Sequence, residues 1–133
     1  MVADVAATHV AVWYLFGDSR PSATAKAFID QTAAMRRTIQ LAPVSLAEVI
    51  YLIEKNRLPA SAYADLRRAL ANPHHILKEA PFTAEIVEAM RQVSRDSVPD
   101  MPDRIVAATA VYLGVPVISR DGRVRASSIQ TIW

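Results

Sequence analysis

The sequence has no cysteine among its 133 residues, and it has only three glycines. Without cysteine there are no disulfides, no thiol nucleophile and no cysteine-ligated zinc, so metal ligands would come from carboxylates and the three histidines. No apolar run reaches the roughly 18 residues of a membrane-spanning helix, and the N-terminus lacks the basic start and apolar stretch of a signal peptide. We therefore expect a cytoplasmic protein with no membrane segment. The formal net charge of +2 is too small to indicate nucleic-acid binding by itself.

Apolar residues make up 52% of the chain, enough for a hydrophobic core, and we expect a single domain over residues 1–133. Short apolar runs alternate with segments of helical periodicity. Strands are predicted at residues 2–10, 39–44, 75–79, 115–119 and 129–133. Helices are predicted at residues 12–16 and 60–70, and others begin near Ser22, Ser45, Thr83 and Pro99. This alternation predicts an α/β fold with helices on both faces of a mainly parallel sheet.

Three acidic residues are predicted to lie at one edge of this sheet. Glu48 is one helical turn past the second strand, Asp103 opens the helix that leads to the fourth strand, and Asp121 follows the fourth strand. Open parallel sheets bind their ligands beyond the carboxyl ends of the strands. Clustered carboxylates repel one another unless a cation lies among them, and Mg²⁺ or Mn²⁺ prefers such oxygen ligands. The sequence therefore predicts a divalent-metal site suited to phosphodiester hydrolysis by a metal-activated water.

Each acid also has a purely structural interpretation. Ser45 and Glu48 have the spacing of a capping box, in which the glutamate bonds the first amide of the helix. Asp100 can cap the helix that contains Asp103. Asp121-Gly122 is a common turn dipeptide. The functional interpretation depends on the acids meeting at one edge.

Four segments, spread from the first predicted strand to the fourth, carry a further signal. They are Ala7-Thr8-His9-Val10-Ala11-Val12-Trp13, Ser45-Leu46-Ala47-Glu48-Val49, Asp103-Arg104-Ile105-Val106-Ala107-Ala108-Thr109-Ala110 and Val117-Ile118-Ser119-Arg120-Asp121. In this order they resemble the motifs of PIN-domain proteins, most of all the VapC-like ribonuclease toxins of type II toxin–antitoxin systems. The resemblance implies a three-layer α/β/α fold, Mg²⁺ or Mn²⁺ bound by acids, RNA cleavage and neutralisation by a VapB-like antitoxin. By the same resemblance Glu48, Asp103 and Asp121 would hold the metal, with Asp100 in support.

The chain departs from the family pattern at position 7. Family members have a metal-binding aspartate where this chain has Ala7. Asp4 is a poor substitute, because it is three residues away, about 10 Å along a strand, and an odd offset points it to the opposite face. We therefore expect the chain to bind metal weakly and to cleave RNA slowly or not at all. The change is either a substitution that disarms the enzyme or a natural decay of the site.

Other polar residues near these motifs have candidate roles. Thr8 and Ser119 can orient carboxylates or waters through their hydroxyls, or form ordinary strand-end hydrogen bonds. Three arginines flank the acids in sequence and either hold RNA phosphates or form a solvated basic face, namely Arg104, Arg120 and Arg123. His9 is expected to pack rather than to bind metal, and His74-His75 is expected to lie in a solvated loop.

The early helices carry more apolar side chains than one small core needs, namely Trp13, Leu15, Phe16, Leu52, Ile53 and Leu66. An amphipathic helix of an antitoxin would fit between them, whereas core packing or a homodimer interface explains the same residues. Two other functions also stay open. One is a catalytically dead PIN-like module that binds RNA or a partner. The other is a nuclease for structured DNA or for RNA processing.

Overall fold

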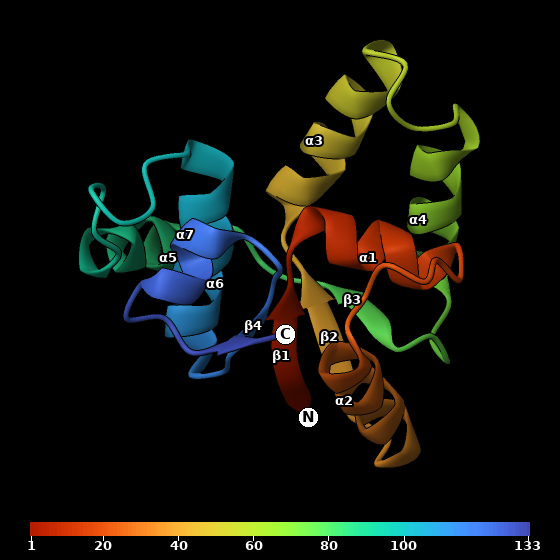
Figure 1. The fold of residues 1–133 in the computed structure, drawn as a ribbon, viewed down its shortest axis with the longest axis horizontal. Coiled ribbons are helices and arrows are strands. Elements are labelled where there is room, and N and C mark those ends of the chain that lie inside the picture. Colours follow the sequence, from red (N-terminus) through yellow and green to blue (C-terminus); the bar gives the residue numbers. More distant parts are fainter.

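A five-stranded parallel sheet forms the centre of the protein in a computed structural model that describes residues 1–133 (Figure 1). All four neighbouring pairs of strands are parallel, and the order across the sheet is β3-β2-β1-β4-β5. The strands are β1 (Val2–Ala6), β2 (Thr38–Leu41), β3 (Leu77–Glu79), β4 (Val117–Ile118) and β5 (Thr131–Ile132). The chain thus builds one half of the sheet outward from β1 before it returns to the other side of β1.

Helices connect the strands and cover both faces of the sheet. They are α1 (Thr8–Leu15), α2 (Ala23–Ala34), α3 (Pro43–Glu54), α4 (Ser61–Ala71), α5 (Ala84–Ala89), α6 (Met101–Leu113) and α7 (Gly122–Ala126), with a 3-10 turn at Met90–Gln92. In Figure 1, α5, α6 and α7 gather on one side of the sheet, and α1, α2 and α4 lie on the other. The three-layer α/β/α fold with a parallel sheet is therefore confirmed. None of the helices combines the length and the apolar character needed to cross a membrane.

Successive side chains of the central strands β1 and β4 point to opposite faces of the sheet and pack in two separate hydrophobic clusters. Val5 and Val117 point to one face, where they pack in a cluster with Val106 and Ala110 of α6. Ala6 and Ile118, one residue further on, point to the other face and join the larger cluster formed with the early helices. Such two-sided burial explains why these strands, apart from Asp4 in β1, are apolar rather than alternating between apolar and polar residues.

The first strand is shorter than predicted. We expected it to cover residues 2–10, but β1 ends at Ala6 and α1 begins at Thr8, where the amide of Ala11 donates to the carbonyl of Ala7. Val10 and Val12 are buried just as the strand residues are. The apolar run continues unbroken from a buried strand into a buried helix, so periodicity gave no sign of the boundary.

The other strands are shorter too, and one boundary alters a motif. The strand predicted at residues 39–44 ends at Leu41, because Pro43 occupies the first turn of α3, where a missing N–H costs nothing. Ser45 consequently lies inside the helix and does not cap it. The strands predicted at residues 75–79, 115–119 and 129–133 shrink to β3, β4 and β5.

The strand order reverses between β1 and β4. From β1 the chain proceeds through β2 to β3 on one side, and then crosses over to place β4 on the other side. At such a switch point the loops beyond the carboxyl ends of the two strands diverge and leave room for a ligand. Ala7 follows β1 there, and Ser119 follows β4.

Candidate active site

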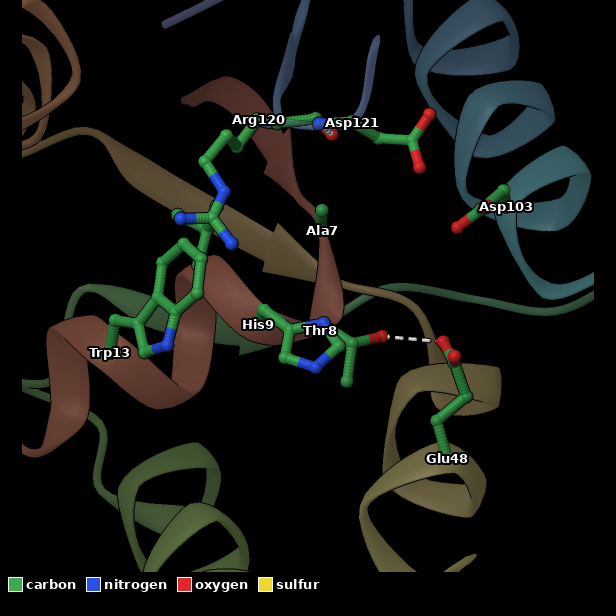
Figure 2. A pocket seen from close by; sticks show the side chains of 10 residues that line it. Ala7, Thr8, His9, Trp13, Glu48, Asp103, Arg120 and Asp121 are labelled. Atoms are coloured by element: carbon green, nitrogen blue, oxygen red, sulfur yellow. Dashed lines mark hydrogen bonds between the residues drawn. The ribbon is translucent and has the colours of Figure 1, made fainter. Parts of the chain in front are cut away.

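A cavity of about 250 Å³ lies at this switch point, beyond the carboxyl ends of β1 and β4 (Figure 2). Its wall comes from four separate parts of the chain, with the residues Ala7, Thr8, His9, Val10, Trp13, Glu48, Asp103, Ser119, Arg120 and Asp121. We call Glu48, Asp103 and Asp121 the carboxylate site. Ala7 lies on the same cavity wall, to one side of these three acids in Figure 2.

Asp103 is positioned by the start of α6. Asp100 is the N-cap of this helix, and its carboxylate accepts a hydrogen bond of 3.2 Å from the amide of Asp103, as the sequence predicted. Because Asp100 caps the first turn, the Asp103 carboxylate is not needed for capping, and Asp103 lines the cavity instead. Asp100 itself is not part of the cavity wall.

The carboxylates act on one another electrostatically. Burial, and then the negative charges of Asp100, Asp121 and Glu48, together raise the pKa of Asp103 to about 7. Near neutral pH the Asp103 side chain is therefore a mixture of its protonated and ionised forms. Repulsion among neighbouring carboxylates disfavours their charged forms when no cation lies among them.

Glu48 is held by a hydroxyl from α1. The Thr8 hydroxyl donates to Oε1 of Glu48 at 2.6 Å, and its oxygen lies 2.8 Å from the buried hydroxyl oxygen of Ser45. Thr8 has a single hydroxyl proton, which the carboxylate takes, so Ser45 must donate to Thr8. The capping-box interpretation of Ser45 and Glu48 is therefore wrong. Sequence reasoning missed Ser45 as a supporting residue, although its spacing of three from Glu48 puts both on one helix face.

Asp121 has a structural role and a place in the site at once. Its Oδ1 accepts hydrogen bonds from the amides of Arg123 and Val124, at 2.9 and 3.1 Å, and so caps the short helix α7. Its amide donates to the hydroxyl of buried Ser119 at 3.0 Å. The simple-turn interpretation of Asp121-Gly122 is thus wrong, because the two residues begin a helix. These three hydrogen bonds fix the backbone of Asp121 and so position its carboxylate.

One cationic side chain faces the cavity from its rim. The Arg120 guanidinium stacks 4.7 Å from the centre of the Trp13 ring, and Arg20 lies 5.2 Å from the same ring. Arg20 is bound to Asp18 by two hydrogen bonds of 3.0 and 2.7 Å, whereas Arg120 makes no side-chain ion pair. Stacking on Trp13 therefore keeps Arg120 at the rim without neutralising it against the carboxylates (Figure 2).

The other two arginines expected to hold RNA lie elsewhere. Arg104 donates to the carbonyls of Met90 and Val93 at 2.8 and 3.0 Å and ties α6 to the 3-10 turn. Arg123 is exposed on α7 and does not line the cavity. Of the two aromatic side chains at the start of α1, Trp13 packs as predicted, but His9 is exposed on the cavity wall.

Asp4 does not contribute to the site. It lies in the middle of β1, fully buried, and neither of its carboxylate oxygens has a hydrogen-bond partner. Burial raises its pKa to about 7, against the opposing charge of Arg37. It is therefore no substitute for an acid at position 7.

The donor set of the carboxylate site matches a hard divalent cation in its chemistry. Glu48, Asp103 and Asp121 offer only oxygen donors, which Mg²⁺ and Mn²⁺ prefer, and burial, followed by the negative charges of the neighbouring acids, raises the pKa of Asp103. The side chains do not converge into a group of three that could hold a metal ion as they stand. Ala7 presents a methyl group to the same cavity.

Comparison with known proteins agrees with this architecture. The family model described as PIN domain matches residues 7–128. Among solved structures, VapBC2 from Rickettsia felis, bound to a DNA fragment from its promoter, is similar with a TM-score of 0.70 at 14% identity, over 98% of this chain and 97% of that chain. FitAcB from Neisseria gonorrhoeae is similar with a TM-score of 0.59 at 17% identity, over 96% and 95% of the two chains. No curated protein matches the sequence. Identities this low establish likeness of fold.

Proposed function

Because the chain belongs to the PIN domain family, we propose that its carboxylate site is the active site of a metal-dependent endoribonuclease, silenced here by Ala7. The observation that carries the proposal is that Glu48, Asp103 and Asp121 line one cavity together with Ala7 at the switch point of the sheet. Paired strand ends, a helix N-terminus and a helix face bring these acids together from distant parts of the chain. A stability role alone gives no reason to gather repelling charges in one cavity.

Magnesium or manganese is the cofactor that suits these donors. Glu48, Asp103 and Asp121 would hold it together with an aspartate at position 7, and Asp100 would support Asp103 through the α6 cap. A bound ion of this kind supplies an activated water and stabilises charge on a phosphate.

The surrounding side chains have separate tasks in this proposal. Thr8 and Ser45 hold the Glu48 carboxylate toward the cavity, and Ser119 fixes the turn that carries Asp121. Arg120 lies at the rim, uncompensated, and is suited to contact a phosphate oxygen of RNA. Arg104 is left out of this role because main-chain carbonyls occupy its guanidinium.

The biological setting we propose is a type II toxin–antitoxin pair in the cytoplasm. A cavity of about 450 Å³ between α1, α3 and the loop after α3 is lined by His9, Val12, Trp13, Phe16, Asp18, Arg20, Leu52, Arg57, Leu58 and Pro59. It combines apolar side chains with exposed arginines, and it adjoins the carboxylate site through His9 and Trp13. An amphipathic segment of a VapB-like antitoxin, apolar on one face and acidic on the other, fits this composition. The assembly would be a homodimer or a toxin–antitoxin hetero-oligomer.

A second candidate function rests on Ala7 itself. If alanine is the natural residue, the chain keeps the fold and the cavity without a full ligand set, and acts as an RNA-binding or partner-binding module. The natural coding sequence distinguishes the two: aspartate at position 7 supports the enzyme, and alanine supports the module.

The decisive experiment compares this chain with its Ala7→Asp variant, both free of antitoxin. We expect the variant to cleave total RNA in Mn²⁺ or Mg²⁺ and to stop when a chelator is added, while the parent chain is inactive. An Ala11→Asp variant is unsuitable as a control because Ala11 is buried, so Ala47→Asp, on the exposed face of α3, is the matched added acid. Equal cleavage by parent and variant would show that position 7 lies outside the site. Inactivity of both would favour the binding module.

A further inference from the structure

A second charged cavity lies near the start of β2, at the opposite end of the strands from the carboxylate site. It has a volume of about 530 Å³ and is lined by Ala33, Arg36, Arg37, Thr38, Pro73, His74, His75, Ile76 and Lys78. Thr38 begins β2 and is paired with Val2 at the start of β1. Ala7 follows Val2 by five residues, which corresponds to roughly 17 Å along a strand. We call this the cationic cavity.

The cations of this cavity form no ion pairs with acids. Arg36, Arg37 and Lys78 carry three permanent charges, no acidic residue lines the cavity, and none of the three forms an ion pair. Lys78 donates to the carbonyl of Asn72 at 2.9 Å, and Arg37 donates to the carbonyl of Val2 at 3.3 Å. These contacts orient the two side chains but leave their charge in place.

Two details single out Arg37 within the cavity wall. Its Nε is buried and has no hydrogen-bond partner. Its charge lowers the pKa of Asp4, but burial still raises that pKa to about 7, so Asp4 is only about half ionised at neutral pH. Asp4 therefore compensates Arg37 only in part.

The two histidines add hydrogen-bond donors rather than fixed charge. The Nδ1 of His75 accepts the amide of Leu77 at 3.0 Å, so the neutral ring carries its proton on Nε2. Burial and the charge of Lys78 lower the pKa of His75, which keeps the ring neutral at pH 7. The cavity thus combines guanidinium, ammonium and imidazole donors, the set that proteins use for phosphate oxygens.

The local backbone explains part of this arrangement and leaves part unexplained. Arg36 has a φ of 55°, in the left-handed region, at the turn that ends α2, and cations near a helix C-terminus are favoured by its dipole. That reason applies to Arg36 and Arg37. It does not apply to Lys78 or His75, which come from β3 and the loop before it and converge on the same cavity.

We propose that the cationic cavity is a phosphate-binding site, distinct from the carboxylate site and independent of any cleavage there. Its ligand is a phosphate group, either in the backbone of RNA or as a free phosphate or nucleotide. Because the cationic cavity lies near the start of β2 and the carboxylates lie beyond the other end of the strands, it holds its ligand away from the carboxylates.

The first test uses inorganic phosphate as the probe, followed by amide chemical shifts of the intact chain. We expect shifts confined to residues 36–38 and 74–78, and their loss in an Arg36→Gln/Lys78→Gln variant. Arg37 is left unchanged because its removal would strand buried Asp4. The matched control is Lys55→Gln/Arg95→Gln, which removes the same charge from exposed positions outside the cavity. Shifts that are absent, or equally scattered in the parent and both variants, overturn the proposal.

A second measurement identifies the source of the phosphate. A labelled 20-nucleotide single-stranded RNA is bound to the parent chain and to both variants over a series of salt concentrations. If RNA is the ligand, the cavity variant lowers the slope of log affinity against log salt by about 1.4, for two lost phosphate contacts, and the control variant does not. An unchanged slope beside localised phosphate shifts assigns the site to free phosphate or a nucleotide. Neither outcome depends on the Ala7→Asp result, so the two proposals fail separately.

Discussion

At the scale of single residues, the molecule contains two carboxyl groups whose pKa is raised to about 7, in both cases chiefly by burial. At Asp103 the negative charges of neighbouring acids add to the rise. Asp4 is buried in β1 without a hydrogen-bond partner, and the charge of Arg37 offsets its burial only in part.

Asp4 predicts how stability depends on pH. Its pKa rises from 3.8 in the unfolded chain to about 7 on folding, so the folded protein binds a proton that the unfolded chain releases. The associated stability is complete below pH 3.8 and is lost as pH rises through about 7. We expect Asp4→Asn to flatten the fall in unfolding free energy between pH 5 and 8 and to be more stable than the parent at pH 8. Asp96→Asn, at an exposed position, should keep the parental profile in urea unfolding.

Thr8 is expected to control metal affinity through Glu48. In the Ala7→Asp background, Thr8→Val removes the hydroxyl that bonds Oε1 while keeping the side-chain shape, and should weaken Mn²⁺ binding about tenfold by calorimetry. Thr109→Val is the control, because the buried Thr109 hydroxyl bonds only the Ile105 carbonyl of its own helix. Equal Mn²⁺ affinity of the Thr8→Val and Thr109→Val variants would argue against positioning by Thr8.

At the scale of elements, helix ends do most of the positioning. The start of α6 presents Asp103, the start of α7 presents the Asp121 backbone, and the second turn of α3 presents Glu48. The Asp100 cap was predictable because its spacing to Asp103 and the following Pro102 are typical of a helix start. The Ser45 hydrogen bond was not, since it depends on where α3 begins and on the position of Thr8, 37 residues away.

The cap of α6 is testable by itself. Asp100→Ala should lose about 1 kcal/mol of unfolding free energy in urea, whereas Asp100→Asn, which retains a capping oxygen, should lose only a few tenths. Both remove a negative charge that raises the pKa of Asp103, so an NMR titration should find that pKa lower in both. Equal stability of the two variants would mean that the capping bond contributes nothing.

At the scale of the whole molecule, the sheet order decides which acids meet. Strand and helix alternation predicted the α/β class, and the motif resemblance predicted the family, but neither revealed the boundaries within continuous apolar runs such as residues 2–12. The buried state of Asp4 and the meeting of Arg36, Arg37 and Lys78 also escaped the sequence. Both depend on how the strands align side by side, which local patterns do not encode.

Metal binding should appear in the stability of the entire fold. A ligand that binds only the folded state adds about 2.7 kcal/mol to the unfolding free energy at a hundred times its Kd. We expect Mn²⁺ to raise the melting temperature of the Ala7→Asp variant by several degrees, reversibly with chelator, and to change that of the parent chain much less. The same rise in both proteins would show that the ion binds away from position 7.

The place of β1 in the sheet has a consequence for synthesis. Its partner β4 begins 115 residues later in the chain, and Asp121 follows only then. A nascent chain therefore carries an open edge of β1, a risk for aggregation, until β4 has been translated. For the same reason an incomplete chain holds only scattered acids. We expect any activity that depends on all three acids to begin only after Asp121 has been made, and a chain truncated before Asp121 to be inert.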